Sequence, residues 1–381
     1  MQEIAFIEGG DACGVNIVIG HGFIITTITR IREVRIMKKL FSLVLTVVFL
    51  FGLQNVCVGA EGGKISIAYA TVVTDHPFWR SQLGTIQDLA KEADYDLNVY
   101  DAGNDPQKQV NQVDTIITTE PDVVIFTAVD TAVGGTLVEK IQKAGIPVVV
   151  LIRIVEGGNP GISVLVGNVA VGKGAGDYIL AALKKKYGEP KGVYLELQGD
   201  LADASVGMFD EGFHGVLDEH SAITGVIKPT KWDLGLASAA AEDVLATRDD
   251  IDAIWLMSDY FIPAVKEIIM QHSALVGEEG HIIVVGDSAD SNALDGIREG
   301  WMDASINMPV NDAAEMAFEY AVILANGEKL SAGSVERAGA PWSPAEIIET
   351  DNGLYLEIPP WPVDASNADD SNLWGNKYRL E

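Results

Sequence analysis

The sequence predicts an α/β protein built from two doubly wound parallel sheets. Short, fully apolar segments such as 123–126 and 148–151 alternate with amphipathic stretches. This alternation is typical of parallel strands buried under helices on both faces. The pattern starts again near Gly192. With 381 residues, the chain is long enough for two such lobes.

The elements follow one another in two sets, with β-prone apolar runs as strands and stretches of helical spacing between them. The first set has strands at 65–70, 97–100, 123–126 and 148–151, with helices at 78–93, 105–119 and 134–144. The second set has strands at 192–197, 224–227, 253–256 and 282–285, with helices at 208–219, 234–247 and 262–271. The tail from about Asp351 is turn-rich and polar, and its pattern predicts no regular structure.

The N-terminal region carries the features of a secretory signal. Met37 and two lysines precede the apolar run 40–53, and Val58 and Ala60 stand at the positions that signal peptidase prefers. The run is short for a membrane-spanning helix, which needs about 20 apolar residues. We therefore predict a signal peptide at 37–60, export to the periplasm, and an upstream over-extension of the reading frame at 1–36. The alternatives are a small N-terminal domain with an anchor, and lipidation at Cys57.

Composition excludes several functions. The chain has 26 Lys and Arg against 55 Asp and Glu, a formal charge of −29, so polyanionic nucleic acids and anionic membrane surfaces would repel it. Both cysteines, Cys13 and Cys57, precede the predicted cleavage site. The exported chain would then have no disulfide, no thiolate nucleophile and no cysteine-bound metal.

Polar and aromatic residues follow the predicted strands. In such sheets ligands bind beyond the carboxyl ends of the strands. Carboxylates, amides and hydroxyls recur there beside aromatic rings, for example in 74–79, 198–200 and 257–260. That mixture suits a polyhydroxyl ligand, whose hydroxyls bond to charged acceptors and whose C–H faces stack on rings.

Residues 64–335 resemble the type 1 periplasmic solute-binding proteins of sugar ABC transporters, the group of ribose- and galactose-binding proteins. The order and spacing of several stretches carry the resemblance, namely 75–79, 100–106 with Gln109 and Gln112, 144–148, 166–168, 176–178, 211–213, 257–259 and 285–287. The resemblance implies two lobes joined by three crossovers. Lobe one would be 64–166 plus 309–331, lobe two 167–308 plus 332–350, and 351–381 a C-terminal extension.

The resemblance also implies the ligand-binding residues, position by position. Aromatic rings would stack on the sugar, and polar side chains of both lobes would bond its hydroxyls. The implied residues are Asp75, Phe78, Trp79, Thr127, Arg153, Asp203, Trp232, Ser258, Asp287 and Asn307. The sequence departs from the family at Ile152, where an Asp is usual, at Ser258, where an Asn is usual, and near Gly207, where a second Arg is absent.

Five of these residues also have a structural alternative. Trp79 and Trp232 could be packing residues, and Asp75 and Asp287 could cap helices. Arg153 could form a crossover ion pair. The run 172–176 resembles a nucleotide-binding loop but lacks the full spacing, so packing of a helix close to the sheet explains it better.

No cofactor and no metal site is predicted. The six histidines show no metal spacing, and the acidic tail lacks the glycine and glutamate of a calcium loop. We therefore expect a non-catalytic, monomeric receptor that captures a neutral sugar or polyol and delivers it to an ABC permease. The alternatives are a sensor for a chemoreceptor or sensor kinase, as with autoinducer-2 receptors, and a periplasmic enzyme.

Overall fold

The computed structural model describes residues 64–201 and 203–379. The predicted signal peptide and the predicted over-extension lie outside the described residues. Within that part of the chain, no helix combines the length and the apolar character needed to cross a bilayer.

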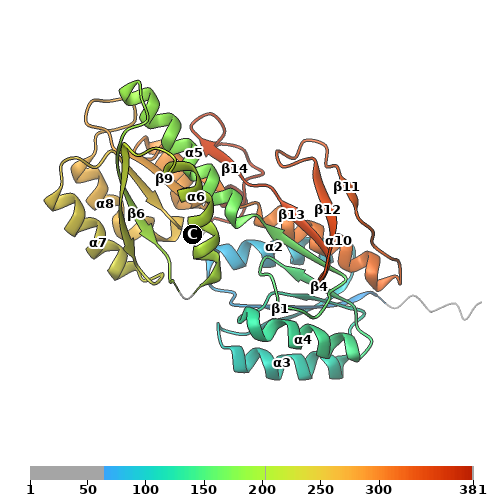
Figure 1. The fold of residues 1–381 in the computed structure, drawn as a ribbon. Coiled ribbons are helices and arrows are strands. Elements are labelled where there is room, and N and C mark those ends of the chain that lie inside the picture. Colours follow the sequence, from blue (N-terminus) through green and yellow to red (C-terminus); the bar gives the residue numbers. More distant parts are fainter. Residues whose placement is uncertain (1–63, 202, 380–381) are drawn as a thin grey trace, which may run out of the picture. The chain divides into compact units, whose positions relative to one another are not determined.

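The first sheet has eight strands in the order β11-β12-β13-β5-β4-β3-β1-β2 (Figure 1). Strands β1 to β5 are parallel, as the alternating pattern predicted, and β13 pairs with β5 in the same direction. Strand β12 pairs antiparallel with both β11 and β13. The strands are β1 (Ser66–Thr71), β2 (Asp96–Asp101), β3 (Val123–Phe126), β4 (Val148–Leu151), β5 (Ile162–Val166), β11 (Gly333–Val335), β12 (Ala345–Thr350) and β13 (Gly353–Ile358).

Helices cover both faces of this sheet, because its central strands are apolar on both sides. Helices α3 (Pro106–Thr119) and α4 (Thr131–Lys143) lie together on one face (Figure 1), where Val124 and Phe126 point. On the other face, Ile125 packs in the core with α2 (Pro77–Glu92) and α10 (Val310–Ala325). We call this sheet with its four helices lobe 1.

The second sheet has six strands in the order β14-β10-β9-β8-β6-β7. All neighbouring strands are parallel except β14, which pairs antiparallel with β10. The strands are β6 (Gly192–Gln198), β7 (Ile223–Pro229), β8 (Ala253–Leu256), β9 (Ile283–Ser288), β10 (Ala304–Asn307) and β14 (Trp361–Asp364).

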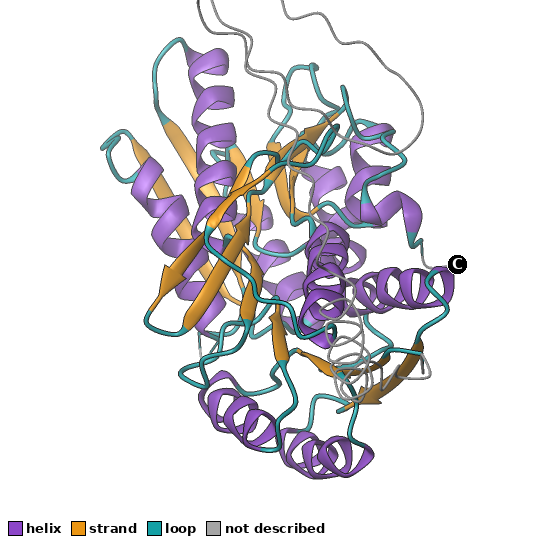
Figure 2. Cartoon of the chain, turned by 90° about the vertical axis from the view of Figure 1, so that its right-hand side faces the viewer, coloured by secondary structure: helices purple, strands orange, loops and turns teal. Residues whose placement is uncertain are grey.

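Helices also cover both faces of the second sheet. In the turned view of the whole chain, too, strands lie between helices (Figure 2). Its two faces belong to separate cores, one with Trp255 and Val285 and one with Ile254 and Val284. We call this sheet with its helices lobe 2. The helices are α5 (Asn168–Tyr187), α6 (Ala204–Leu217), α7 (Leu234–Thr247), η1 (Asp259–Phe261), α8 (Ile262–His272), α9 (Ser291–Glu299) and α11 (Trp374–Lys377).

The described chain passes between the lobes three times, after β5, after β10 and after β13. This confirms the predicted fold of two α/β lobes joined by three segments. The boundaries differ at the C-terminal end. Residues 333–350, expected in lobe 2, form β11 and β12 of the lobe 1 sheet, and the tail from about Asp351 forms β13, β14 and α11. Residues 345–350 alternate between buried and exposed side chains at their start, as an antiparallel strand does, and therefore differ from the fully apolar runs of the central strands.

The glycines of 172–176 pack against a helix as well as against the sheet. A Cβ on Gly174 would lie 3.3 Å from the side chain of Ile306 on β10, the predicted close approach to the sheet. A Cβ on Gly172 would lie 2.0 Å from the carbonyl oxygen of Phe209, and a Cβ on Gly212 would lie 2.0 Å from that of Val169. Helices α5 and α6 therefore cross with their backbones in close contact. The glycines allow packing of one helix on another, and they form no nucleotide loop.

Candidate functional site

In lobe 1 the candidate residues lie at the carboxyl ends of three neighbouring strands. The segment 75–79 follows β1, Thr127 follows β3, and Arg153 follows β4. Strands β4, β3 and β1 are adjacent in the sheet, so the sheet brings together residues far apart in the sequence. Asp75 is exposed and does not cap α2. Instead the ring of His76 accepts from the backbone N–H of Phe78 at 3.3 Å.

Trp79 and Arg153 form the central contact of this group. The Cζ of Arg153 lies 5.1 Å from the centroid of the Trp79 ring, a cation–π geometry. Phe78 meets the same ring edge-on at 4.9 Å. Arg153 also donates from Nη1 to the carbonyl oxygens of Ala128 and Val129 at 3.3 and 2.9 Å. These contacts orient the guanidinium between the ends of β3 and β4. Burial lowers the pKa of Arg153.

In lobe 2, buried carboxyl and amide groups stand on the neighbouring strands β9 and β10. Asp287 and Asn307 are 2% and 1% exposed. The Oδ1 atoms of both residues have no hydrogen-bond partner within the protein, and neither does Oγ1 of Thr127 in lobe 1. Buried polar atoms are normally paired, so these three oxygens are the candidates for ligand contact in this region. Burial raises the pKa of Asp287 well above its usual range.

Three other candidates in lobe 2 have partners within the protein. Asp203 caps α6, accepting from the backbone N–H of Ser205 at 2.9 Å. Ser258 caps η1 by accepting from the N–H of Tyr260 at 3.3 Å. Trp232 stacks on Phe261 with ring centroids 5.8 Å apart. Each cap uses one side-chain oxygen in part. The half-buried Trp232 also lies against Gly199, where a Cβ would come within 2.0 Å of the ring.

Two contacts link the lobes beside these residues. The charge of Asp203 in lobe 2 acts on Arg153 in lobe 1 and opposes the fall of its pKa. The rings of His76 in lobe 1 and Tyr260 in lobe 2 lie 5.2 Å apart. The ring contact of His76 with Tyr260 thus places the segment after β1 beside the segment after β8.

Sequence reasoning missed two residues in this region. Asp259 is fully buried, and its Oδ2 accepts from the N–H of Asp290 at 3.1 Å and from Ser305 Oγ at 2.8 Å. Burial raises the pKa of Asp259 most, and the negative charges of Asp290 and Asp287 raise it further. Trp374, from the tail, is 2% exposed and donates its indole N–H to the carbonyl oxygen of Ser288. The aromatic residues of the otherwise polar tail were the sequence signal that could have indicated Trp374.

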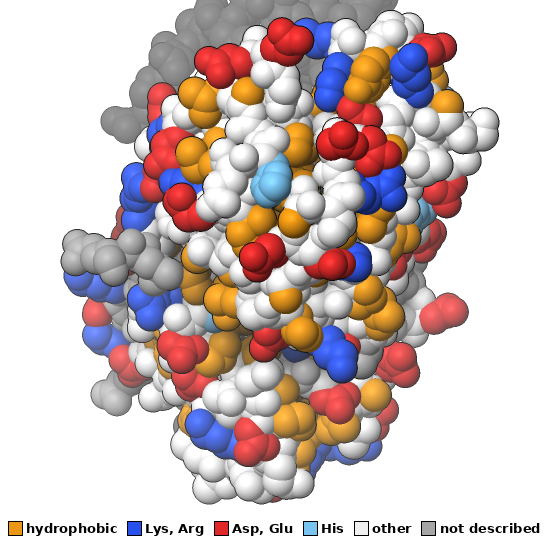
Figure 3. All heavy atoms as spheres, turned by 90° about the vertical axis from the view of Figure 1, so that its left-hand side faces the viewer, with side chains coloured by type: hydrophobic (Ala, Val, Ile, Leu, Met, Phe, Trp, Pro, Cys, Tyr) orange, Lys and Arg blue, Asp and Glu red, His pale blue; other side chains and the backbone are white. Residues whose placement is uncertain are grey.

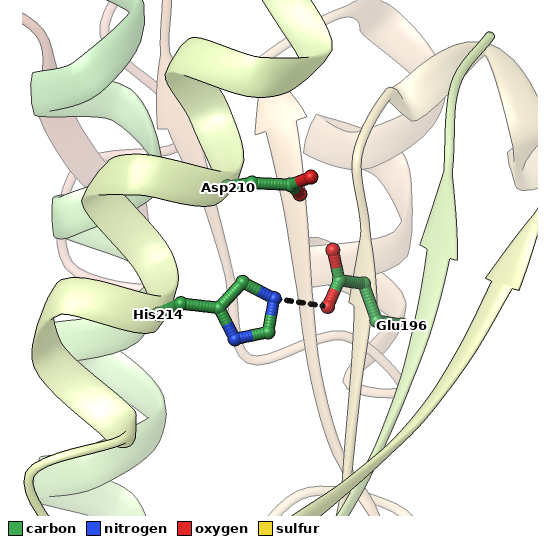
Figure 4. A group of neighbouring side chains, drawn as sticks. All are labelled: Glu196, Asp210 and His214. Carbon is green, nitrogen blue, oxygen red and sulfur yellow. Dashed lines mark ion pairs between the residues drawn. The ribbon is translucent and has the colours of Figure 1, made fainter. Parts of the chain in front are cut away.

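A second cluster lies between β6 and α6 (Figure 4). Glu196 points toward Asp210 and His214, and Nε2 of His214 lies 3.2 Å from Oε2 of Glu196. Within the described ranges these three residues are a group that could hold a metal ion, with ligand atoms within 4.8 Å of one another. Hydrogen bonding to Glu196 raises the pKa of His214 to about 9. A metal would have to displace that proton. His214 and Glu196 face each other as an ion pair, while burial raises the pKa of Glu196.

The surface is acidic without being uniform. On the face drawn in Figure 3, acidic side chains are spread among basic and apolar ones. A phosphate backbone requires a continuous basic surface, and this face offers none. The expectation against nucleic-acid binding therefore rests on the overall charge of −29 and on this distribution.

Known proteins with similar sequences or structures are described as solute-binding proteins. A ribose import binding protein from Haemophilus influenzae is 25% identical over 296 residues, which cover 78% of this chain and 96% of that protein. A solute-binding protein structure from Actinobacillus succinogenes with bound D-allose superposes with a TM-score of 0.66 at 19% identity, covering 81% of this chain and all of that one. A fructose-binding periplasmic domain of a hybrid two-component system has a TM-score of 0.64 at 20% identity, covering 81% and 93%.

Residues 67–329 match the family model described as periplasmic binding protein domain. The match spans more than half of the chain and includes all strands from β3 to β10. The chain therefore belongs to the periplasmic binding protein domain family.

Proposed function

We propose that this protein is an exported solute receptor that captures a sugar or polyol between its lobes and delivers it to an ABC permease. The observation that carries the proposal is the set of unpartnered buried oxygens on Thr127, Asp287 and Asn307 at the strand ends of both lobes. Hydroxyl groups of a polyol can donate to all three, while the Trp79 ring supplies an apolar face.

The ligand is neutral. Arg153 is the cation at these strand ends, and it already faces the Trp79 ring, two carbonyl oxygens and the charge of Asp203. Asp287, in contrast, is an acceptor that suits a hydroxyl and repels an anion. The curated relative imports ribose, and the compared structures hold D-allose or are described as fructose-binding.

Binding would proceed by closure of the two lobes. Aromatic residues of lobe 1 meet the ligand first, and the carboxyl and amide groups of lobe 2 complete its hydrogen bonds. The closed, monomeric form then presents both lobes to the permease. Asp75, Phe78, Ser258, Asp203 and Trp232 complete the proposed ligand contacts.

Native mass spectrometry of freshly purified protein tests this proposal, because a receptor of this kind retains its ligand. Calorimetry against D-ribose, D-xylose, D-allose, D-fructose, myo-inositol and glycerol then ranks affinities. Saturable one-to-one binding of a sugar or polyol supports the proposal. Exclusive binding of an amino acid or an anion contradicts it.

Sensing is a second candidate, because one structural neighbour is the periplasmic domain of a hybrid two-component system. The partner then differs, while the fold and the ligand class remain. Stimulation of a reconstituted permease ATPase by the liganded protein favours transport, and a response of a sensor kinase or chemoreceptor favours sensing. Recovery of the intact sugar after denaturation opposes a periplasmic enzyme, and turnover of the sugar would support one.

A further inference from the structure

The C-terminal segment Ala365–Arg379 contacts both lobes. It follows β14 in the lobe 2 sheet and contains α11. We call it the C-terminal latch. It lies beyond the matched family region, which ends at residue 329.

The latch is held mainly by lobe 2. Arg298 of α9 donates to Asp369 at 2.8 Å, to the carbonyl oxygen of Ala368 at 2.7 Å and to Asn376 Oδ1 at 2.6 Å. Arg379 pairs with Asp295 of the same helix. These contacts all involve α9, whereas Asn311 of α10 in lobe 1 donates one bond from Nδ2 to the carbonyl oxygen of Asn372 at 3.2 Å.

Trp374 connects the latch to the end of β9. Its indole N–H donates to the carbonyl oxygen of Ser288 at 2.7 Å. Ser288 and Ala289 have φ angles of 109° and 54°, which are unfavourable for residues with a side chain. The indole therefore helps to hold a strained turn directly after Asp287, one of the proposed ligand acceptors.

The latch also contacts α2 of lobe 1 through two aromatic rings. The Trp374 ring meets the edge of Phe78 with centroids 6.3 Å apart. The Tyr378 ring lies against Gly84, where a Cβ would come within 2.5 Å of it. Its hydroxyl is 3.1 Å from Thr85 Oγ1 and 3.4 Å from Asp88 Oδ2. Phe78 in turn contacts Trp79.

We propose that Trp374 and Tyr378 are positioning residues whose contacts with α2 hold the two lobes together and so slow the release of the ligand. This inference rests on the proposed function. The latch has ion pairs and several hydrogen bonds to α9 but only ring contacts and hydroxyl bonds to α2. Opening of the lobes would therefore break the contacts to α2 first.

The test compares single-group deletions with matched controls in the full chain. Tyr378→Phe removes the latch hydroxyl, and Tyr355→Phe removes a hydroxyl bound to Glu357 on β13. Trp374→Phe removes the indole N–H, and Trp342→Phe removes a comparable one bound to Asp312. Thermal melting first establishes that each variant is folded.

Stopped-flow tryptophan fluorescence with D-ribose measures the association and dissociation rate constants separately. Loss of the Tyr378 hydroxyl bonds to α2 should raise the dissociation rate about 3–10-fold, with the association rate changed less than about twofold. Trp374→Phe removes a bond to Ser288 within lobe 2 and should raise the dissociation rate less. Hydrogen exchange of α2 amides in unliganded protein should accelerate about threefold in Tyr378→Phe and remain unchanged in the controls. A merely structural role would lower the melting temperature without this split of rates.

The outcomes distinguish the two proposals. If wild-type protein binds no D-ribose and none of the other tested sugars, the proposed function fails, while faster exchange in α2 still supports the latch contact. If D-ribose binds and dissociates equally fast from the latch and control variants, the retention role is overturned. Unchanged exchange in α2 overturns the latch contact itself.

Discussion

The guanidinium of Arg153 lies over the ring of Trp79, with 5.1 Å from Cζ to the ring centroid. The two residues are 74 positions apart (153 − 79), and the parallel order of β4, β3 and β1 brings their strand ends together. This contact covers one face of the Trp79 ring, and the proposed ligand would stack on the other. Trp79 is 8% exposed, so a ligand on that face would be well shielded from water.

Replacement of Trp79 by Ala should weaken sugar binding by about 1–3 kcal/mol, because a stacked and shielded ring is lost. Calorimetry with the sugar identified by native mass spectrometry measures the change. Trp79→Phe, which keeps an aromatic face, should lose less. Unchanged affinity in a folded Trp79→Ala variant would remove Trp79 from the site.

Arg153 and Asp203 should be energetically coupled in the liganded protein, because they bring opposite charges from the two lobes. Asp203→Asn keeps a capping oxygen for α6 and removes the charge. A double-mutant cycle with Arg153→Gln, measured as ligand affinity, should give about 0.5–1 kcal/mol of coupling. The exposed pair Arg248 and Asp250 is the matched control and should give none. Strict additivity at Arg153 and Asp203 would show that closure does not bring the two charges together.

Asp287→Asn should stabilise the unliganded protein at neutral pH and weaken sugar binding. Burial raises the pKa of Asp287, so this carboxyl group lowers the stability of the folded protein once it ionises in the unfolded chain. This free-energy cost is absent below the unfolded pKa of about 4 and grows as the pH rises toward the pKa of Asp287 in the folded protein. Removal of the buried charge should therefore add about 1–3 kcal/mol to the free energy of unfolding at pH 8 and less at pH 5.

Urea denaturation at the two pH values measures this difference. Asp105→Asn is the control, because Asp105 caps α3 at an exposed position and Asn can replace it there. A destabilised Asp287→Asn variant at pH 8 would indicate that the carboxylate has a partner in the unliganded protein.

His214→Gln should destabilise the protein most under mildly acidic conditions. The ion pair with Glu196 raises the pKa of His214 to about 9, above an unfolded value of about 6.5. The stabilisation is therefore complete below about pH 6.5 and is lost as the pH rises to about 9. We expect a loss of about 1–2 kcal/mol at pH 6 that shrinks toward pH 9.5.

The free energy of unfolding, followed from pH 5.5 to 9.5, measures the effect. His272→Gln, at an exposed position at the end of α8, should show no such trend. An NMR titration that placed the pKa of His214 near its ordinary value would contradict the ion pair and reopen the cluster to metal binding.

Local sequence patterns were sufficient for the central parts of both lobes. The apolar runs 123–126, 148–151 and 253–256 became β3, β4 and β8 with the predicted bounds. A strand buried on both faces must be apolar throughout, so its sequence alone identifies it. The same rule placed Thr127, Arg153 and Asp287 at strand ends, because ligands of such sheets bind there.

Only the tertiary structure decided what surrounds these residues. The pairing of β13 with β5, the α9 contacts of the latch, and the approach of Trp374 to Phe78 involve segments that lie 70 or more residues apart in the chain. No local periodicity encodes such contacts, since they depend on shape and hydrogen bonding between finished elements. The sequence by itself thus determined the two sheets and their strand ends, whereas long-range packing decided which side chains meet between them.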